Sequence, residues 1–468
     1  MEIKKHHVTS KEDKVSIKQK VGYAMGAMAT NVAINSVANL TGLIYNVGLG
    51  LSPVLTGVAQ GIPRLWDAIS DPLIGNLSDN TRTKYGRRIP YIFVGCIAMG
   101  ITYWLFWMAP CGWNEYATFG YLVIMSLLFY TAYTLLEVPR GALGYEMTDD
   151  YHERTVIFAY CSFFINVGSL TIPWLYYLAN LKIFGSEIIG MRYVGAGLGC
   201  ILIVAGMTCA IVCKEQKIEQ IKHQEKIKFS ESVVLTLKNK TFLWLLGVVF
   251  LVTIGFYFVS GFTNYIMIYF VYGGDKPAAS VMMGWCGTLW STLSLVGVFG
   301  MTWIAARIGK STTVMIFLVV MAVGNLLKIF CYDPNHPWLV LIPTASLSMG
   351  MLVLFSLIYS MMADICDEDE VNTGKRREGS YQAIYGLLWK LGIGLAYFAA
   401  GGLLESTGFD EDLAVQSDST LYWLRFWDIC LPSAVCLLGA ALMIRYPLTE
   451  KRAYQIKEIL QDKRKNSR

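Results

Sequence analysis

The stretch RLWDAISDPLIGNLSDNTRTKYGRR, residues 64 to 88, places three ionisable side chains in otherwise apolar sequence. Arg64, Asp67 and Asp71 stand at positions i, i+3 and i+7, and this spacing predicts that they share one face of an α-helix. A polar loop with four basic residues follows them. What two carboxylates do on such a helix depends on the medium that surrounds it.

The composition indicates a membrane protein. Of the 468 residues, 54% are hydrophobic and only 16% are charged, and the mean hydropathy is +0.45. Apolar stretches near the roughly 20 residues that cross a bilayer recur between residues 20 and 446. Because backbone polar groups in hydrocarbon must be satisfied within their own segment, we expect these stretches to be α-helices.

The hydropathy pattern predicts an all-α integral membrane protein with twelve membrane-spanning helices. Six precede and six follow a polar stretch at 214–240, which carries seven lysines and four glutamates. The predicted helices cover residues 20–48, 53–78, 90–110, 117–145, 155–180, 189–213, 241–272, 279–308, 311–331, 338–362, 380–404 and 421–446.

The basic loops all fall on one side of the predicted bundle. They alternate with loops such as 405–419, which has five acidic residues and no basic one. The positive-inside rule therefore places both termini in the cytoplasm. The predicted organisation is a cytoplasmic tail at 1–19, an N-terminal six-helix half at 20–213, a cytoplasmic central loop at 214–240, a C-terminal six-helix half at 241–448 and a basic cytoplasmic tail at 449–468.

The two aspartates of the opening stretch then need partners inside the membrane. A lone carboxylate at that depth costs at least about 2.5–3.5 kcal/mol on insertion scales, so it is expected to face the bundle interior. Arg64 can be one partner, but it cannot neutralise two aspartates. The remaining negative charge favours a bound cation, either Na⁺ or Li⁺ held by oxygen ligands or a proton. A closed Arg–Asp network that only stabilises packing is the alternative.

Other classes of protein lack their signatures. No P-loop indicates an ATP-driven pump, and Cys209 and Cys213 have no neighbouring His or Cys that would indicate a metal site. No nucleophile–base pair or metal cluster indicates an enzyme. The basic N-terminus lacks the apolar core of a signal peptide, so no cleavage is expected. Anionic lipid headgroups account for the net charge of +5, so no nucleic-acid partner is expected.

Twelve spans divided by a basic seam resemble the major facilitator transporters, whose halves rock around a midplane site. The loop GNLSDNTRTKYGRR is similar to that superfamily's G-x-x-x-D-[RK]-x-G-[RK]-[RK] loop, and IAARIGKS is its reduced echo in the second half. The opening stretch more specifically resembles the glycoside–pentoside–hexuronide:cation symporter family, whose best-known member is the melibiose permease. YAMGAMATN, YTLLEVPRGALGYEMTDDYHERT and ADICDEDEVNTGKRREGSYQAIYGLLWKLG extend this likeness along the whole chain.

The family resemblance implies a cation site and a set of gating residues. Asp67 and Asp71 would be the cation carboxylates, Thr134 would add an oxygen, and Ser70 stands where the melibiose permease has an Asn that favours sodium. The coupling cation stays open between Na⁺ and H⁺, with Li⁺ a further candidate, and no cofactor or other metal is implied. The implied gating residues are Asp79, Arg87, Arg88 and Arg154.

The implied sugar site departs from the galactoside pattern. Asn31 and Glu137 each replace an Asp, and Thr30 replaces a Lys; Gly141 and Ser162 replace a Trp and an Arg. Arg140, beside Glu137, would either pair a uronate carboxylate bidentately or lie at the helix end without a ligand. The predicted substrate-binding residues are Thr30, Asn31, Tyr133, Glu137, Arg140, Tyr385, Trp389 and Lys390.

The function implied by the resemblance is cation-coupled import of a glycoside, pentoside or hexuronide by a monomeric, multi-pass protein of the cell membrane, inner or plasma. Its expected partners are the sugar and the lipid bilayer. Two alternatives stay open, namely sodium-dependent transport of another solute such as a lysophospholipid, and a sugar sensor on the same fold that does not transport.

Overall fold

The structure is a computed structural model of the chain. It describes residues 14–148, 150–214, 238–373, 378–411, 413, 415–448, 452–453, 455–456 and 458–460. The predicted segments 1–19, 214–240 and 449–468 lie wholly or largely outside the described residues. Residues 1–51 and 65–224 form one compact unit, and residues 52–64 and 225–468 form a second.

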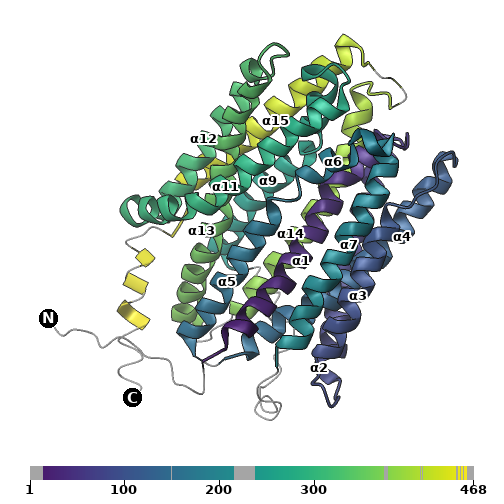
Figure 1. The fold of residues 1–468 in the computed structure, drawn as a ribbon. Coiled ribbons are helices and arrows are strands. Elements are labelled where there is room, and N and C mark those ends of the chain that lie inside the picture. Colours follow the sequence, from purple (N-terminus) through teal and green to yellow (C-terminus); the bar gives the residue numbers. More distant parts are fainter. Residues whose placement is uncertain are drawn as a thin grey trace. The chain divides into compact units, whose positions relative to one another are not determined.

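Long helices build the first unit. Within it, α1 packs against α4, α5 and α7, and α3 packs against α4 and α7 (Figure 1). The helices are α1 (Ile17–Thr41) with a π-helical end η1 (Gly42–Asn46), α3 (Ile89–Phe106), α4 (Glu115–Glu146), α5 (Tyr151–Ser169), α6 (Trp174–Ala179), the 3-10 turn η2 (Lys182–Phe184) and α7 (Glu187–Val212). The helix α2 (Pro53–Asn80) contributes its residues 53–64 to the second unit and the rest to the first.

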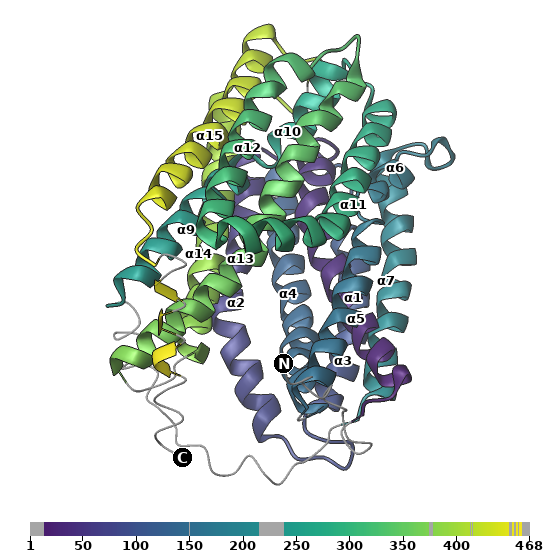
Figure 2. The same ribbon diagram turned by 90° about the vertical axis from the view of Figure 1, so that its left-hand side faces the viewer.

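The second unit is also helical. Within it, α12 packs against α13 and α15, and α9 packs against α14 and α15; α12 and α15 lie side by side in Figure 1 and Figure 2. The helices are α9 (Lys240–Val259), α10 (Phe262–Tyr265), the π-helix η4 (Ile266–Val271), α11 (Lys276–Ile308), α12 (Lys310–Cys331), the 3-10 turn η5 (Pro337–Val340), α13 (Leu341–Thr373), α14 (Glu378–Ser406) and α15 (Asp418–Ile444).

The all-helical prediction is confirmed. Ten helical segments in the described part of the chain are long and apolar enough to cross a membrane. The two other predicted spans correspond to α1 with η1 and to α2, and these two helices have 25 and 28 residues. About 20 residues suffice to cross the hydrocarbon core, so both are long enough to span it.

Three predicted spans differ from the observed helices. The span predicted at 241–272 is interrupted after α9 at Ser260 and Gly261 and continues as α10 and η4. The span predicted at 155–180 is interrupted before α6, where Pro173 cannot donate a backbone hydrogen bond. The span predicted to end at residue 362 continues as α13 to Thr373. The added residues, ADICDEDEVNT, are polar, so hydropathy could not detect a helix that runs on past its apolar part.

Glycines let the helices of the first unit approach closely. A Cβ added to Gly199 of α7 would lie 2.6 Å from the carbonyl oxygen of Gly100 on α3. A Cβ added to Gly95 would lie 2.6 Å from the backbone nitrogen of Leu136 on α4. Small residues at such crossings are typical of membrane helices, whose association depends on close van der Waals packing.

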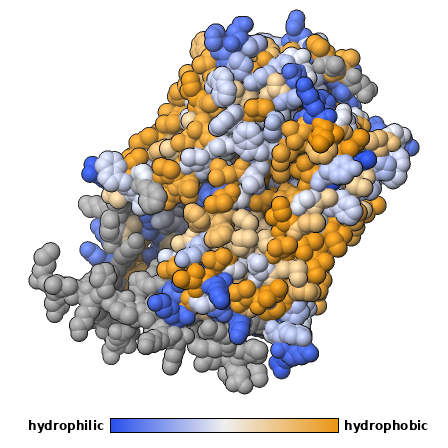
Figure 3. Space-filling model, viewed as in Figure 1, coloured by the Kyte–Doolittle hydropathy of each residue, from blue (hydrophilic) through white to orange (hydrophobic). Residues whose placement is uncertain are grey.

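Large apolar side chains remain exposed on the outside of the helices. Ile124 and Leu128 of α4 are about half exposed, as are Ile201 and Val204 of α7. Figure 3 shows hydrophobic residues covering much of one face, with hydrophilic residues gathered mainly near its ends. Apolar surface of this extent fits contact with lipid.

The α3–α7 crossing predicts that two neighbouring glycines of α7 differ in how well they tolerate an alanine. Gly199→Ala should lower the melting temperature of the detergent-solubilised protein, because overpacking of a tight contact costs about 1–3 kcal/mol. Gly197→Ala is the matched control, since an added Cβ there meets no atom within 4 Å. Both changes gain the same helix propensity. Equal melting temperatures for the two variants would contradict the proposed role of the crossing.

Candidate functional site

The first candidate site is an acidic cluster on α2 in the first unit. Asp67, Ser70 and Asp71 lie within about one turn of this helix and share a face. Asp67 is 1% exposed and Ser70 is 3% exposed, whereas Asp71 is half-buried. Thr134 of α4 is fully buried, and its Oγ1 donates a hydrogen bond to Asp71 Oδ1 over 3.1 Å. We call these four residues the α2 cluster.

The α2 cluster offers only oxygen atoms. Its two carboxylates supply negative charge, and its two hydroxyls supply neutral lone pairs. The Ser70 Oγ is buried and has no hydrogen-bond partner among the described residues. A buried hydroxyl without a hydrogen-bond partner raises the free energy of the folded protein unless it binds a ligand. A small hard cation held by the neighbouring carboxylates would do so, and the residues therefore fit Na⁺, Li⁺ or H⁺.

Arg64, which the sequence predicts as a partner of the aspartates, belongs to the part of α2 that groups with the second unit. There it lies within hydrogen-bonding reach of the Tyr397 hydroxyl on α14. The two helices approach closely because Gly57 leaves room, and a Cβ there would lie 2.6 Å from the Tyr397 carbonyl oxygen. Tyr397 is thus a partner of Arg64 that the sequence did not predict.

Glu137 and Arg140 of α4 form an ion pair. The Arg140 Nε donates to Glu137 Oε2 over 3.0 Å, and a second nitrogen of the guanidinium donates to Oε1. The guanidinium also lies over the ring of Tyr23 on α1, 5.1 Å from its centroid. The Arg140 side chain is 8% exposed and the Glu137 side chain is 29% exposed. Arg140 therefore orients Glu137, which presents the more accessible surface.

The other predicted sugar-binding residues of the first unit differ in their surroundings; they are Thr30, Asn31 and Tyr133. Asn31 is half-buried, and its Oδ1 accepts a hydrogen bond from Ser169 over 3.0 Å. Tyr133 of α4 is half-buried, and its ring lies 6.5 Å from that of Tyr130 between centroids. Thr30 is buried, and its hydroxyl donates to carbonyl oxygens of its own helix. The Thr30 hydroxyl thus uses its one donor within α1, and its role in sugar binding stays a prediction.

Aromatic rings form a continuous group in the second unit, which we call the aromatic strip. Tyr385 and Trp389 of α14 are stacked with centroids 6.0 Å apart. Phe355 and Tyr359 of α13 pack on them at 5.2 and 5.9 Å. The strip comprises Tyr257, Phe355, Tyr359, Tyr385, Trp389 and Tyr397. Lys390 follows Trp389 and is half-buried.

The sequence predicted only Tyr385 and Trp389 of this strip. Phe355 and Tyr359 stand four residues apart on α13, a spacing that places them on one face of the helix. Tyr385 and Trp389 of α14 have the same i, i+4 spacing. A search of the sequence for a second aromatic pair with this spacing could therefore have identified Phe355 and Tyr359.

The predicted gating residues form a charged group at one end of the first unit. Arg88 bonds Asp79 Oδ1 at 3.0 Å and Glu146 Oε1 at 2.9 Å, and Arg87 also pairs with Glu146. Arg154 donates to the carbonyl oxygens of Thr148 and Tyr145 over 3.1 and 3.4 Å. Glu146 joins α4 to the loop after α2, and the sequence had not singled it out.

The sequence also missed a buried ion pair in the second unit. Lys328 of α12 lies 2.9 Å from Asp428 Oδ2 of α15, and both side chains are at most 7% exposed. The Tyr332 hydroxyl donates to the same oxygen over 2.7 Å, and Thr263 Oγ1 donates to Oδ1 over 3.0 Å. Each charge stands in an otherwise apolar span, which is the same signal that singled out the α2 aspartates.

Long apolar helices that carry a few paired charges are the architecture of a multi-pass membrane protein. The family model described as MFS/sugar transport protein matches residues 22–450. The chain therefore belongs to this family, and it is a multi-pass membrane protein.

Relatives cover nearly the whole chain. "Uncharacterized symporter sll1374" of Synechocystis is 26% identical, over 97% of this chain and 98% of the relative. "Putative glycoside/cation symporter YagG" of Escherichia coli is 24% identical, over 94% of each. "Sodium-dependent lysophosphatidylcholine symporter 1-A" of Danio rerio is 22% identical, over 94% of this chain and 87% of the relative. Symporters of sugars and other solutes thus share this sequence pattern.

A solved structure shares the fold. The "Crystal structure of D-xylose-proton symporter" is similar with a TM-score of 0.67 and 13% identity, over 93% of this chain and 98% of that one. This likeness confirms the predicted major facilitator fold.

The buried ion pair of the second unit predicts an asymmetric response to mutation. Lys328→Met should lower the thermal stability strongly, because an uncompensated buried charge costs about 3–5 kcal/mol. The double variant Lys328→Met/Asp428→Leu should recover part of the melting temperature in detergent, because it buries no charge. Lys182→Met, at an exposed position, is the control. A double variant less stable than Lys328→Met would contradict this account.

Proposed function

We propose that the protein is a secondary symporter that couples sugar uptake to a monovalent cation by alternating access. The observation that carries this proposal is the α2 cluster, in which two intramembrane carboxylates and two hydroxyls supply oxygen ligands and no sulfur or nitrogen. Ionisable side chains within membrane-spanning helices mark ion and substrate pathways in many transporters. Membership of the sugar transport family supports the same reading.

The cation gradient supplies enough energy for this task. One elementary charge moving down 100 mV releases about 2.3 kcal/mol, which corresponds to an accumulation of roughly fifty-fold. Asp67 and Asp71 would bind the cation, and Glu137 would bind sugar on α4, the helix that also carries Thr134. Cation and sugar binding would then favour one another, because both stabilise the same arrangement of α2 and α4.

We propose Na⁺ as the coupling cation in preference to H⁺. A proton needs only a carboxylate, whereas Na⁺ also uses neutral oxygens. The partnerless buried hydroxyl of Ser70 and the hydroxyl of Thr134 supply such oxygens. The printed name of the Danio rerio relative, a sodium-dependent symporter, is consistent with this preference.

We propose a neutral glycoside or pentoside as the substrate in preference to a hexuronide. Arg140 already binds both oxygens of Glu137, so a uronate would have to displace that carboxylate. Glu137 is the more exposed partner and can accept hydrogen bonds from sugar hydroxyls. The half-buried Asn31 would add an amide that both donates and accepts.

Uptake measurements in proteoliposomes test which cation gradient drives transport. Purified protein in proteoliposomes should accumulate a neutral glycoside or pentoside under an imposed sodium gradient, and a proton gradient alone should drive less uptake. Asp71→Asn should abolish accumulation while insertion is retained, because the cluster loses a negative ligand. Asp418→Asn, at an exposed residue in the first turn of α15, is the control.

Three results would count against this proposal. Loss of insertion in Asp71→Asn would favour a purely structural role for the aspartate. Saturable sugar binding without uptake under either gradient would favour a sensor. Uptake of lysophosphatidylcholine in place of any sugar would favour a lipid cargo.

The second prediction concerns the substrate. Glu137→Gln should raise the KM for the sugar about tenfold or more, because a hydrogen bond to a charged group contributes about 1.5–3 kcal/mol. Arg140→Lys should also raise the KM, because Lys cannot hold both oxygens of Glu137. Initial uptake rates measure both effects, with Ser162→Ala as the control because its hydroxyl bonds its own helix. An unchanged KM in Glu137→Gln would exclude Glu137 from the sugar site.

A further inference from the structure

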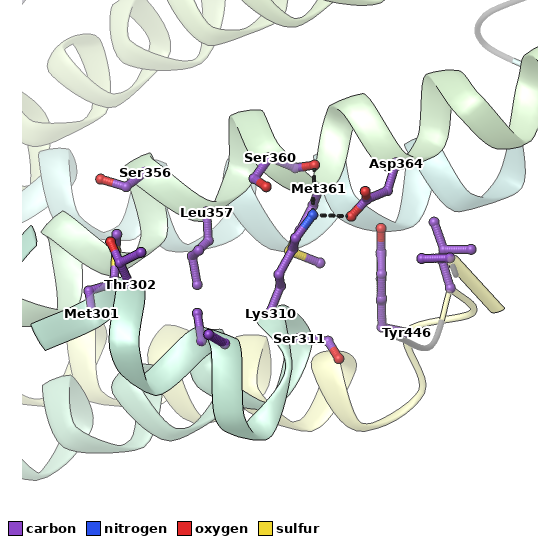
Figure 4. A pocket seen from close by; sticks show the side chains of 14 residues that line it. Met301, Thr302, Lys310, Ser311, Ser356, Leu357, Ser360, Met361, Asp364 and Tyr446 are labelled. Atoms are coloured by element: carbon purple, nitrogen blue, oxygen red, sulfur yellow. Dashed lines mark hydrogen bonds and ion pairs between the residues drawn. The ribbon is translucent and has the colours of Figure 1, made fainter. Parts of the chain in front are cut away.

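The second unit contains a pocket that the proposed transport function does not use. It has a volume of about 380 Å³ and lies between α11, α12, α13 and the residues that follow α15. Figure 4 shows Lys310, Ser360, Asp364 and Tyr446 around it. Its volume falls within the range of about 300–1,000 Å³ that is typical of small-molecule sites.

One helix separates this pocket from the aromatic strip. Ser356, Ser360 and Asp364 stand at i, i+4 and i+8 of α13 and line the pocket. Phe355 and Tyr359 each precede one of these serines, and they pack against α14 instead. The pocket and the strip therefore use different faces of α13.

Several hydroxyls of the pocket have no side-chain hydrogen bond to the residues that the structure describes. Many serine and threonine hydroxyls in the described helices donate to a carbonyl of their own helix, as Ser346 does to Pro343. Ser311, Ser356 and Ser360 have no side-chain hydrogen bond among the described residues.

Tyr446 adds a fourth such hydroxyl. Its side chain is 7% exposed, and its hydroxyl is buried and without a hydrogen-bond partner in the described part of the chain. Burial, together with the nearby carboxylates of Asp364 and Glu368, raises the pKa of this hydroxyl. Tyr446 therefore stays protonated and can donate a hydrogen bond to a ligand.

The charges of the pocket cancel. The Lys310 ammonium pairs with Asp364 Oδ2 and also donates to the Ser360 carbonyl oxygen over 3.3 Å. Because these two charges neutralise one another, neither an anion nor a cation gains a net electrostatic attraction from the pair. The lining also includes apolar side chains, among them Met301, Leu357 and Leu448. The lining thus combines unused hydroxyls with an apolar face and no net charge.

We propose that this pocket binds a neutral, polyhydroxylated molecule of about the size of a monosaccharide. Its hydroxyls would bond the three serines and Tyr446, and its apolar face would lie on the methionine and leucine side chains. Such a ligand would bridge α13 to the residues after α15. The proposal rests on the pocket alone and does not depend on the proposed coupling cation or transported sugar.

Protection of Lys310 from acylation tests this proposal. The full-length protein in nanodiscs is treated with N-hydroxysuccinimidyl acetate, and mass spectrometry follows the acetylation of Lys310. The Lys310 side chain is 33% exposed. The probes are D-glucose, D-galactose, D-xylose and their methyl glycosides. Nanodiscs with and without a monoglucosyl diacylglycerol distinguish a free sugar from a glycolipid headgroup as the source of the hydroxyls.

We expect at least one probe to slow Lys310 modification saturably. Ser360→Ala and Tyr446→Phe should each raise the half-protecting concentration about three- to tenfold, as expected for one lost hydrogen bond. Ser356→Leu, which fills the pocket, should abolish protection. Ser346→Ala is the matched control on the same helix. All four variants should retain sodium-driven uptake, so loss of ligand binding in the pocket is distinguishable from loss of transport.

Three outcomes would overturn the proposal. One is the absence of protection by every neutral probe and by the glycolipid. A second is protection by glucuronate or inorganic phosphate that the neutral sugars do not match. The third is equal protection of the wild-type protein and Ser356→Leu, which would show that the sugars act elsewhere.

Discussion

The hydrogen bond from Thr134 to Asp71 joins α4 to α2 at the place where two carboxylates interrupt an otherwise apolar helix. Carboxylates in such surroundings must be paired, protonated or bound to a cation, because desolvation makes an isolated charge costly. Asp67 and Ser70 lie beside this bond and are almost fully buried. The cluster therefore concentrates negative charge and unused oxygen where a small cation would be stabilised.

The remaining structure keeps charged groups in defined positions. Arg140 holds Glu137 with two hydrogen bonds, and Lys328 neutralises Asp428 in the other unit. The tight contact of Gly95 with Leu136 packs α3 against α4, the helix that carries Glu137 and Arg140. Glu137 and Asp428 thus each have a basic partner on the same or a neighbouring helix, so that neither carboxylate is left as an isolated buried charge.

Hydropathy and spacing predicted the helical architecture and the α2 aspartates, because both depend on local patterns. The prediction failed where structure continues beyond the apolar residues, as at the polar end of α13. It also failed for contacts between distant segments. The pairing of Lys328 with Asp428 and the contact of Arg64 with Tyr397 join residues far apart in the chain. Thr30 was predicted to contact sugar, and only the structure shows its hydroxyl bonded to its own helix.

Equilibrium binding of radioactive sodium to the purified protein tests the central claim most directly. The account predicts saturable binding that lithium displaces and that a transported sugar tightens, since linkage requires the two ligands to favour each other equally. Asp67→Ala should remove this binding while the protein stays folded in detergent. Sodium binding that survives in Asp67→Ala, or a folded wild-type protein that binds no sodium, would contradict the account.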